Sequence, residues 1–168
     1  MKNIKIEIKW AIIFVIITLV WMVLERQAGL YNENIDKHAS FSYFFAIPAI
    51  TLYVFALLDK RKNHYHGTMN YKQGFVTGLI ITLFVTVLCP LTQYITTTYI
   101  ATDYFPNVIK HAVSQGKMTQ AEAESFFNLN SYIWQGLLGT AMMGTVTSAI
   151  VAIFTRQKVK GNLVATPA

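Results

Sequence analysis

Charged side chains are scarce in this chain. Asp, Glu, Lys and Arg make up 13% of the 168 residues, against about 25% in a typical soluble domain. The few charges also avoid four long apolar stretches, at roughly residues 10–24, 40–58, 74–100 and 132–155. A helix needs about 20 mainly apolar residues to cross about 30 Å of hydrocarbon. Because no stretch has a polar face, the pattern argues against four buried helices of a soluble bundle.

Cysteine and readable catalytic groups are equally scarce. The single cysteine, Cys89, excludes an internal disulfide. His64 and His66 lie two residues apart, but no further metal ligand lies near them in the sequence. No pair of nucleophile and base is readable, and the glycines near the C-terminus lie inside an apolar stretch rather than after a strand. The sequence therefore predicts no enzyme, no metal site and no cofactor.

What the chain has instead is four predicted membrane spans, at about residues 6–26, 40–58, 74–99 and 132–155. The first apolar stretch is short, so it needs flanking lysines that extend to the membrane surface. Glu25 and Arg26 occupy the region where small cleavage-site residues belong in a signal peptide. We therefore expect the first span to remain attached as a membrane anchor.

The segment between the last two spans, 103–128, is predicted to form two short helices outside the membrane. Asp103 precedes the first helix and is its expected N-cap, and Pro106 falls in the opening turn. Thr119 and Glu122 have the spacing of a capping box at the start of the second. The single domain therefore covers residues 1–158, and the tail 159–168 is predicted to be disordered.

The basic residues are distributed unequally between the two sides of the membrane. Only Arg26, Lys37, Lys110 and Lys117 fall on the side that holds the 103–128 segment. The other side holds ten, which are Lys2, Lys5, Lys9, Lys60, Arg61, Lys62, Lys72, Arg156, Lys158 and Lys160. Basic loops stay in the cytoplasm, so both termini are predicted to be cytoplasmic. These basic residues are expected to contact anionic lipid headgroups and not nucleic acid.

Small residues repeat at every fourth position in the third and fourth spans. Residues four apart share one face of a helix, and such faces let membrane helices approach closely. We expect the two stripes to pack against each other within one molecule; pairing between copies is the alternative. The stripes are Gly74, Gly78, Thr82 and Thr86 in the third span, and Gly136, Thr140, Gly144, Ser148 and Ala152 in the fourth.

Several motifs together resemble a known family. They are Met69-Asn70-Tyr71-Lys72-Gln73-Gly74-Phe75, Pro90-Leu91-Thr92-Gln93-Tyr94, Asp103-Tyr104-Phe105, the run from Gly116 to Ala123, and the run from Gly144 to Ile150. Over nearly the whole chain, this set resembles a bacterial family of small four-span membrane proteins that is known only as a domain of unknown function. The resemblance implies four helices with an outer helical insertion between the last two, in a bacterial inner membrane. It implies no activity and no functional residue.

Four polar residues near the outer membrane surface are the candidates for a binding site. Glu25 and Arg26 end the first span, Gln93 lies late in the third, and Gln135 lies early in the fourth. If the two stripes face each other, Glu25, Gln93 and Gln135 approach one another and form a polar pocket open to the outside. The alternative is a set of interfacial residues in an aromatic belt with an interhelical hydrogen bond.

The sequence thus predicts an all-α integral membrane bundle of four transmembrane helices with a short helical outer insertion between helices three and four. The leading functional hypothesis is a structural or accessory subunit of a membrane assembly, without catalytic activity. Its partners are then the lipid bilayer and either a second copy of the chain or another membrane protein. The alternative is a carrier or binder of a small molecule or lipid, through the outer polar pocket.

Overall fold

The computed structural model describes residues 4–157, and their regular structure is helical. The elements in chain order are α1 (Lys5–Gln27), α2 (Ile35–Ser42), the 3-10 turn η1 (Tyr43–Phe45), α3 (Ala46–Asn63), α4 (Tyr71–Ile95), the π-helical turn η2 (Thr96–Ile100), α5 (Tyr104–Ser114), α6 (Gln120–Phe126) and α7 (Leu129–Thr155). The predicted all-α fold is confirmed.

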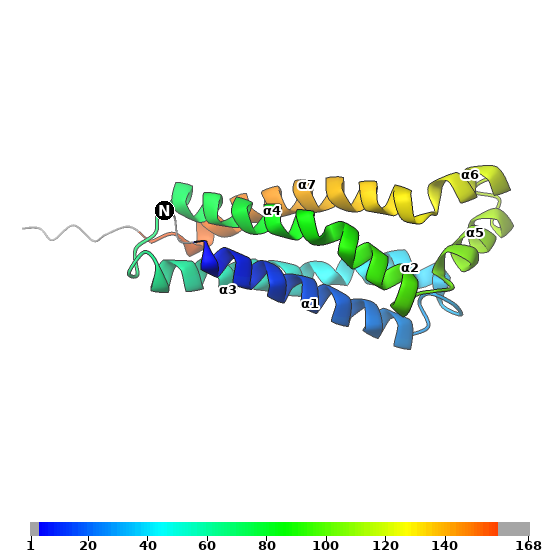
Figure 1. The fold of residues 1–168 in the computed structure, drawn as a ribbon, viewed down its shortest axis with the longest axis horizontal. Coiled ribbons are helices and arrows are strands. Elements are labelled where there is room, and N and C mark those ends of the chain that lie inside the picture. The colour runs from blue at the N-terminus through cyan, green and yellow to red at the C-terminus, as the bar shows by residue number, and fades with distance from the viewer. Residues whose placement is uncertain (1–3, 158–168) are drawn as a thin grey trace, which may run out of the picture.

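Four long rods lie side by side and form the bundle (Figure 1). They are α1, the continuous segment α2–η1–α3, the continuous segment α4–η2, and α7. Each is long and apolar enough to cross a membrane, which confirms the prediction of a four-helix integral membrane bundle. We call the end of the bundle that holds the start of α1 the terminus end, and the opposite end, which holds α5 and α6, the insertion end (Figure 1).

The second rod is longer at both ends than the predicted span 40–58. It begins at Ile35 and continues to Asn63, so the connection from α1 consists only of residues 28–34. Pro48 lies in the first turn of α3, where the missing N–H of a proline is tolerated. The helix tightens into the 3-10 turn η1 immediately before α3 begins. As a result, His38 lies on the same helix as Ser42 rather than in a loop.

The two small-residue stripes face each other along α4 and α7, the most extensive helix pairing in the bundle. A Cβ atom placed on Gly78 would lie 2.6 Å from the Cβ of Ser148, so only glycine permits this approach. From the terminus end toward the insertion end, the facing pairs are Gly74–Ala152, Gly78–Ser148, Thr82–Gly144 and Cys89–Gly136. The first three pairs keep one antiparallel register and the last is shifted by one residue, so each stripe is occupied by the other within one molecule.

Hydroxyl groups of the stripes are largely satisfied inside this interface. The hydroxyls of Tyr53 and Thr82 are hydrogen-bonded at 2.7 Å, which ties α3 to α4. The Ser148 hydroxyl donates to the Gly144 carbonyl at 2.6 Å. The hydroxyl of Thr86 is buried and has no hydrogen-bond partner among residues 4–157. The interface therefore combines close backbone approach with short local hydrogen bonds, as membrane helices do.

Two ion pairs join α1 to α3 at the terminus end. Glu7 and Lys60 are 2% and 3% exposed, and the Lys60 ammonium lies 2.9 Å from a carboxylate oxygen of Glu7. Lys9 pairs with Asp59, whose carboxylate also accepts a hydrogen bond from the Trp10 indole at 2.7 Å. The sequence prediction placed these charges at the membrane surface and missed the burial of the first pair.

The insertion contains α5 and α6, and the two predicted caps differ in outcome. Thr119 and Glu122 form the predicted capping box at the start of α6. Asp103 precedes α5, but its side chain makes no cap hydrogen bond, so that prediction was wrong. An N-cap side chain bonds to the N–H of the second or third helical residue, and the third residue of α5 is Pro106, which has no N–H. The predicted disordered tail, 159–168, lies outside the described residues.

Candidate functional site

A single buried carboxylate marks the insertion end of α1. Glu25 is 2% exposed although it lies only two residues before the helix ends. It shares the inner face of α1 with Glu7 and Ala11, the other two buried residues of that helix. The separations from Glu25 correspond to about five helical turns for Glu7 and about four for Ala11, at 3.6 residues per turn. The helix periodicity therefore directs this carboxylate into the bundle rather than to its surface.

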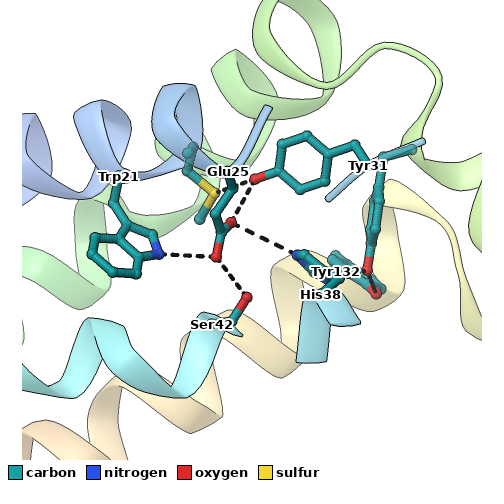
Figure 2. A network of polar contacts seen from close by, with 8 residues as sticks. Trp21, Glu25, Tyr31, His38, Ser42 and Tyr132 are labelled. Atoms are coloured by element: carbon teal, nitrogen blue, oxygen red, sulfur yellow. Dashed lines mark hydrogen bonds and ion pairs between the residues drawn. The ribbon is translucent and has the colours of Figure 1, made fainter. Parts of the chain in front are cut away.

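Four side chains surround the Glu25 carboxylate (Figure 2). One oxygen accepts hydrogen bonds from the indole N–H of Trp21 at 2.9 Å and from the hydroxyl of Ser42 at 2.6 Å. The other accepts from the hydroxyl of Tyr31 at 2.7 Å, and the Nε2 atom of His38 lies 3.7 Å from it. A buried carboxylate needs such partners because its desolvation is costly.

These partners reach Glu25 from three short segments. Trp21 lies one helical turn before it on α1, so both side chains share one face. Tyr31 follows the tight turn at Gly29, whose φ of +70° is readily adopted only by glycine among common residues. His38 and Ser42 lie four residues apart on α2. The short connection between α1 and α2 is thus folded around the carboxylate.

An aromatic cluster continues from His38 toward α5 and α7. The hydroxyl of Tyr104 lies 3.4 Å from His38 Nδ1 and 2.9 Å from the hydroxyl of Tyr132. Burial raises the pKa of Tyr31 and of Tyr104 above its ordinary value, and the nearby charge of Glu25 raises the pKa of Tyr31 further. Both phenols therefore stay protonated at physiological pH, and Tyr31 remains a donor to Glu25.

The network borders a cavity of about 170 Å³. Its other lining residues come mainly from the middle of α1, from η1 and from the α4–η2 segment. The full lining is Thr18, Trp21, Met22, Glu25, Tyr31, His38, Ser42, Phe45, Gln93, Thr96, Thr97, Ala101, Tyr104 and Tyr132. An engineered cavity of about 150 Å³ holds benzene, so this space suits a molecule of roughly six to eight non-hydrogen atoms.

Two of the four predicted site residues line this cavity. Glu25 supplies its carboxylate. Gln93 is half-buried, and its side-chain amide has no hydrogen-bond partner within the described part of the chain. The two therefore present a negative charge and an amide to the same space.

Arg26 and Gln135 do not line the cavity, which corrects the predicted set. Arg26 is exposed, and its guanidinium donates to the Tyr99 carbonyl at 3.3 Å. Gln135 is exposed on α7 because the next residue, Gly136, faces Cys89 and Gln93. Adjacent residues point about 100° apart around a helix, so Gln135 is directed away from the cavity when Gly136 packs against α4.

The sequence prediction missed most of the partners of Glu25. Trp21 is detectable, because it lies four residues before Glu25 on a predicted helix. Tyr31 and His38 lie in the predicted connection between the first two spans, and Ser42 lies at the start of the predicted second span. Tyr104 belongs to the insertion, so no periodic pattern connects these residues with Glu25. Their convergence depends on how the short segments fold together.

Within residues 4–157, no group of three or more His, Cys, Asp or Glu side chains is placed to hold a metal ion. The site has one carboxylate and one imidazole in contact, and the remaining groups are neutral hydroxyls, an amide and aromatic rings. Such a set can bind a small molecule by hydrogen bonds, charge and ring contacts.

Comparison with known proteins gives one match. Residues 9–157 match the model of a family described as "Protein of unknown function (DUF4199)". No curated protein and no solved structure matches the chain.

Proposed function

The chain belongs to the DUF4199 family of proteins of unknown function, and from its geometry we propose that it is a membrane receptor or carrier for a small molecule held beside Glu25. One observation carries the proposal. A carboxylate that is 2% exposed borders a cavity of about 170 Å³ at the insertion end of the bundle. Ionisable side chains inside a membrane bundle are costly and are therefore functional candidates by default.

The cavity lining favours binding over catalysis. The hydroxyls of Thr18, Thr96 and Thr97 each donate to a carbonyl one turn earlier in their own helix, all at 2.9 Å. None of these three hydroxyls is paired with a base. The Ser42 hydroxyl does donate to the Glu25 carboxylate, but that carboxylate also accepts from Trp21 and Tyr31. The groups left to contact a ligand are the Glu25 carboxylate, the Gln93 amide and the rings. This supports a binding protein without enzymatic activity.

The small-residue stripes give no support to a structural or accessory role. Pairing of the stripes with a second copy was the alternative to packing within one molecule, and it would have supplied a contact surface for such a role. Both stripes are occupied by each other between α4 and α7. Gly139 is the one α7 glycine with no neighbouring atom within 4 Å of its Cβ position, and a single glycine is a weak interaction motif. We therefore favour the ligand-binding function.

We further propose that the insertion end faces away from the cytoplasm, since the sequence assigns ten of the fourteen Lys and Arg residues to the opposite side. Two variants test this orientation, Lys62→Cys and Lys117→Cys. Each is made in a Cys89→Ser background, which removes the single native cysteine. Both lysines are exposed, one at each end. In intact bacterial cells, a membrane-impermeant maleimide should label the Lys117→Cys variant alone. Labelling of the Lys62→Cys variant alone would reverse the proposed orientation.

Ligand binding in the cavity is testable by thermal unfolding in detergent. We expect at least one class of compounds with up to about eight non-hydrogen atoms, drawn from cations, neutral molecules and anions, to stabilise the protein. At one hundred times the dissociation constant, the gain is about 2.7 kcal/mol. Ala101→Leu places a larger side chain in the cavity lining and should abolish this gain.

The matched control for this experiment is Ala39→Leu, an exposed alanine on α2 at the same end of the bundle. It should leave the ligand-induced stabilisation intact. If no compound class stabilises the wild type, or if both leucine variants respond to the compounds as the wild type does, the cavity is not a binding site.

A further inference from the structure

We propose that the cavity beside Glu25 binds an alkylammonium group, that is, a compact organic cation with one positive charge. This inference rests on the proposed binding function and names the class of its ligand. The cation is supplied either by a free amine or by the headgroup of a membrane lipid, since both carry the same chemistry. Charge, ring content and size each point to this class.

The charge of the lining favours a cation. Among the lining residues, Glu25 is the one acid, and neither Lys nor Arg is present. The neighbouring Arg26 is directed to the Tyr99 carbonyl instead. Trp21, Tyr31 and Ser42 donate neutral hydrogen bonds, which stabilise the carboxylate but add no positive charge. His38 also faces the carboxylate and leaves its charge uncompensated as long as the imidazole is neutral. An anion is therefore repelled, whereas a cation gains an attraction that low-dielectric surroundings strengthen.

The rings of the lining also favour a cation. Trp21, Phe45, Tyr31, Tyr104 and Tyr132 all border the cavity. The centroids of Trp21 and Phe45 are 5.6 Å apart, and those of Tyr104 and Tyr132 are 5.9 Å apart. Rings surrounding a site attract alkylated ammonium groups through their negative faces. In Figure 2 the carboxylate of Glu25 lies between Trp21 on one side and Tyr31 and His38 on the other.

The size of the cavity limits the ligand to a compact group. A volume of about 170 Å³ corresponds to roughly six to eight non-hydrogen atoms by comparison with cavities that bind benzene. A trimethylammonium or ethanolammonium group falls within this limit. The amide of Gln93, which has no protein hydrogen-bond partner in the described chain, is available to a hydroxyl or phosphate oxygen attached to such a group.

The decisive comparison is between choline chloride and 3,3-dimethyl-1-butanol, which have the same shape but differ in charge. Trp21 becomes the one fluorescent indole in a Trp10→Phe/Trp134→Phe background, and it lines the cavity. In nanodiscs of phosphatidylglycerol, we expect choline to change its fluorescence with at least tenfold higher affinity than the neutral alcohol. Equal affinities, or tighter binding of the alcohol, would overturn the ammonium assignment while leaving the proposed binding function standing. If neither compound binds and no other compound class stabilises the protein, both proposals fail.

Two variants test whether Glu25 and Phe45 contribute to choline binding. Glu25→Gln should lower choline affinity about tenfold or more, toward that of the neutral alcohol. Because this change also disturbs the carboxylate network, Phe45→Leu provides an independent test that leaves every hydrogen bond of Glu25 in place. It should lower the affinity for choline about three- to fivefold, as expected for the loss of one cation–π contact. The affinity for the alcohol should change by less than twofold. If neither variant alters the ratio of the two affinities, the site is not the one proposed.

The lipid composition distinguishes the two sources of the cation. If a lipid headgroup is the ligand, phosphatidylcholine nanodiscs should compete with choline and lower its apparent affinity relative to phosphatidylglycerol nanodiscs. If a free amine is the ligand, the two affinities should agree within twofold. Both results support an ammonium site, because each requires choline to bind to the protein in phosphatidylglycerol nanodiscs.

Discussion

Gly144→Leu is expected to destabilise the folded bundle by about 3 kcal/mol or more. A Cβ at this position would lie 2.5 Å from Thr82 Cγ2 and 2.9 Å from the Tyr53 hydroxyl. Thr82 is a short, branched side chain that is hydrogen-bonded to Tyr53, so it cannot move aside without breaking that bond. Overpacking costs about 1–3 kcal/mol and occasionally more, and the lost hydrogen bond adds about 1 kcal/mol.

The matched control for this prediction lies on the same helix. Gly139 has no atom within 4 Å of its Cβ position, so Gly139→Leu should change stability by no more than about 0.5 kcal/mol, as surface substitutions do. The free energy of unfolding of both variants is measured by titrating sodium dodecyl sulfate into mixed micelles and following circular dichroism. Equal destabilisation by the two leucines would show that the α4–α7 groove is not the main packing interface.

Glu25→Ala is expected to cost about 3–5 kcal/mol of folding free energy. The change removes the acceptor of Trp21, Tyr31 and Ser42 at once. Each buried donor without a partner costs about 1–3 kcal/mol, and the three costs are not independent because the donors share one acceptor. The helix α2 should also loosen, since Ser42 and His38 hold it against α1.

The adjacent residue provides the control for Glu25. Arg26 is exposed and makes one long hydrogen bond to a carbonyl, so Arg26→Ala should cost about 0.5 kcal/mol. Hydrogen exchange of the α2 amides measures the local effect, which we expect to be large for Glu25→Ala and small for Arg26→Ala. A Glu25→Ala protein as stable as the wild type would show that the carboxylate network contributes nothing to the fold.

The membrane architecture was readable from the sequence because bilayer thickness fixes the length of an apolar helix. The scarcity of charge within the stretches was sufficient to identify four spans. The helical bounds differed most for the second span, where the apolar run ends before the helix does. This helix continues beyond the apolar stretch through polar residues, among them His38 and Lys60. A span predicted from hydropathy alone does not include these residues.

The candidate site was predictable only in part. Glu25 and Gln93 were identified as polar residues at similar depth, and both line the cavity. Depth does not specify the direction in which a side chain points, and for this reason Arg26 and Gln135 were grouped with them. Their exclusion follows from helix rotation: Glu25 and Gly136 face inward, and the adjacent Arg26 and Gln135 point about 100° away, toward the exposed surface.

The sequence by itself determined the four apolar rods and the two small-residue stripes, because hydropathy and a spacing of four residues are local properties of a helix. Only the tertiary structure decided that the stripes face each other in one molecule and that Trp21, Tyr31, His38 and Ser42 converge on Glu25. These contacts join segments whose relative rotation and loop path are set by packing across the whole bundle, and no local pattern encodes them.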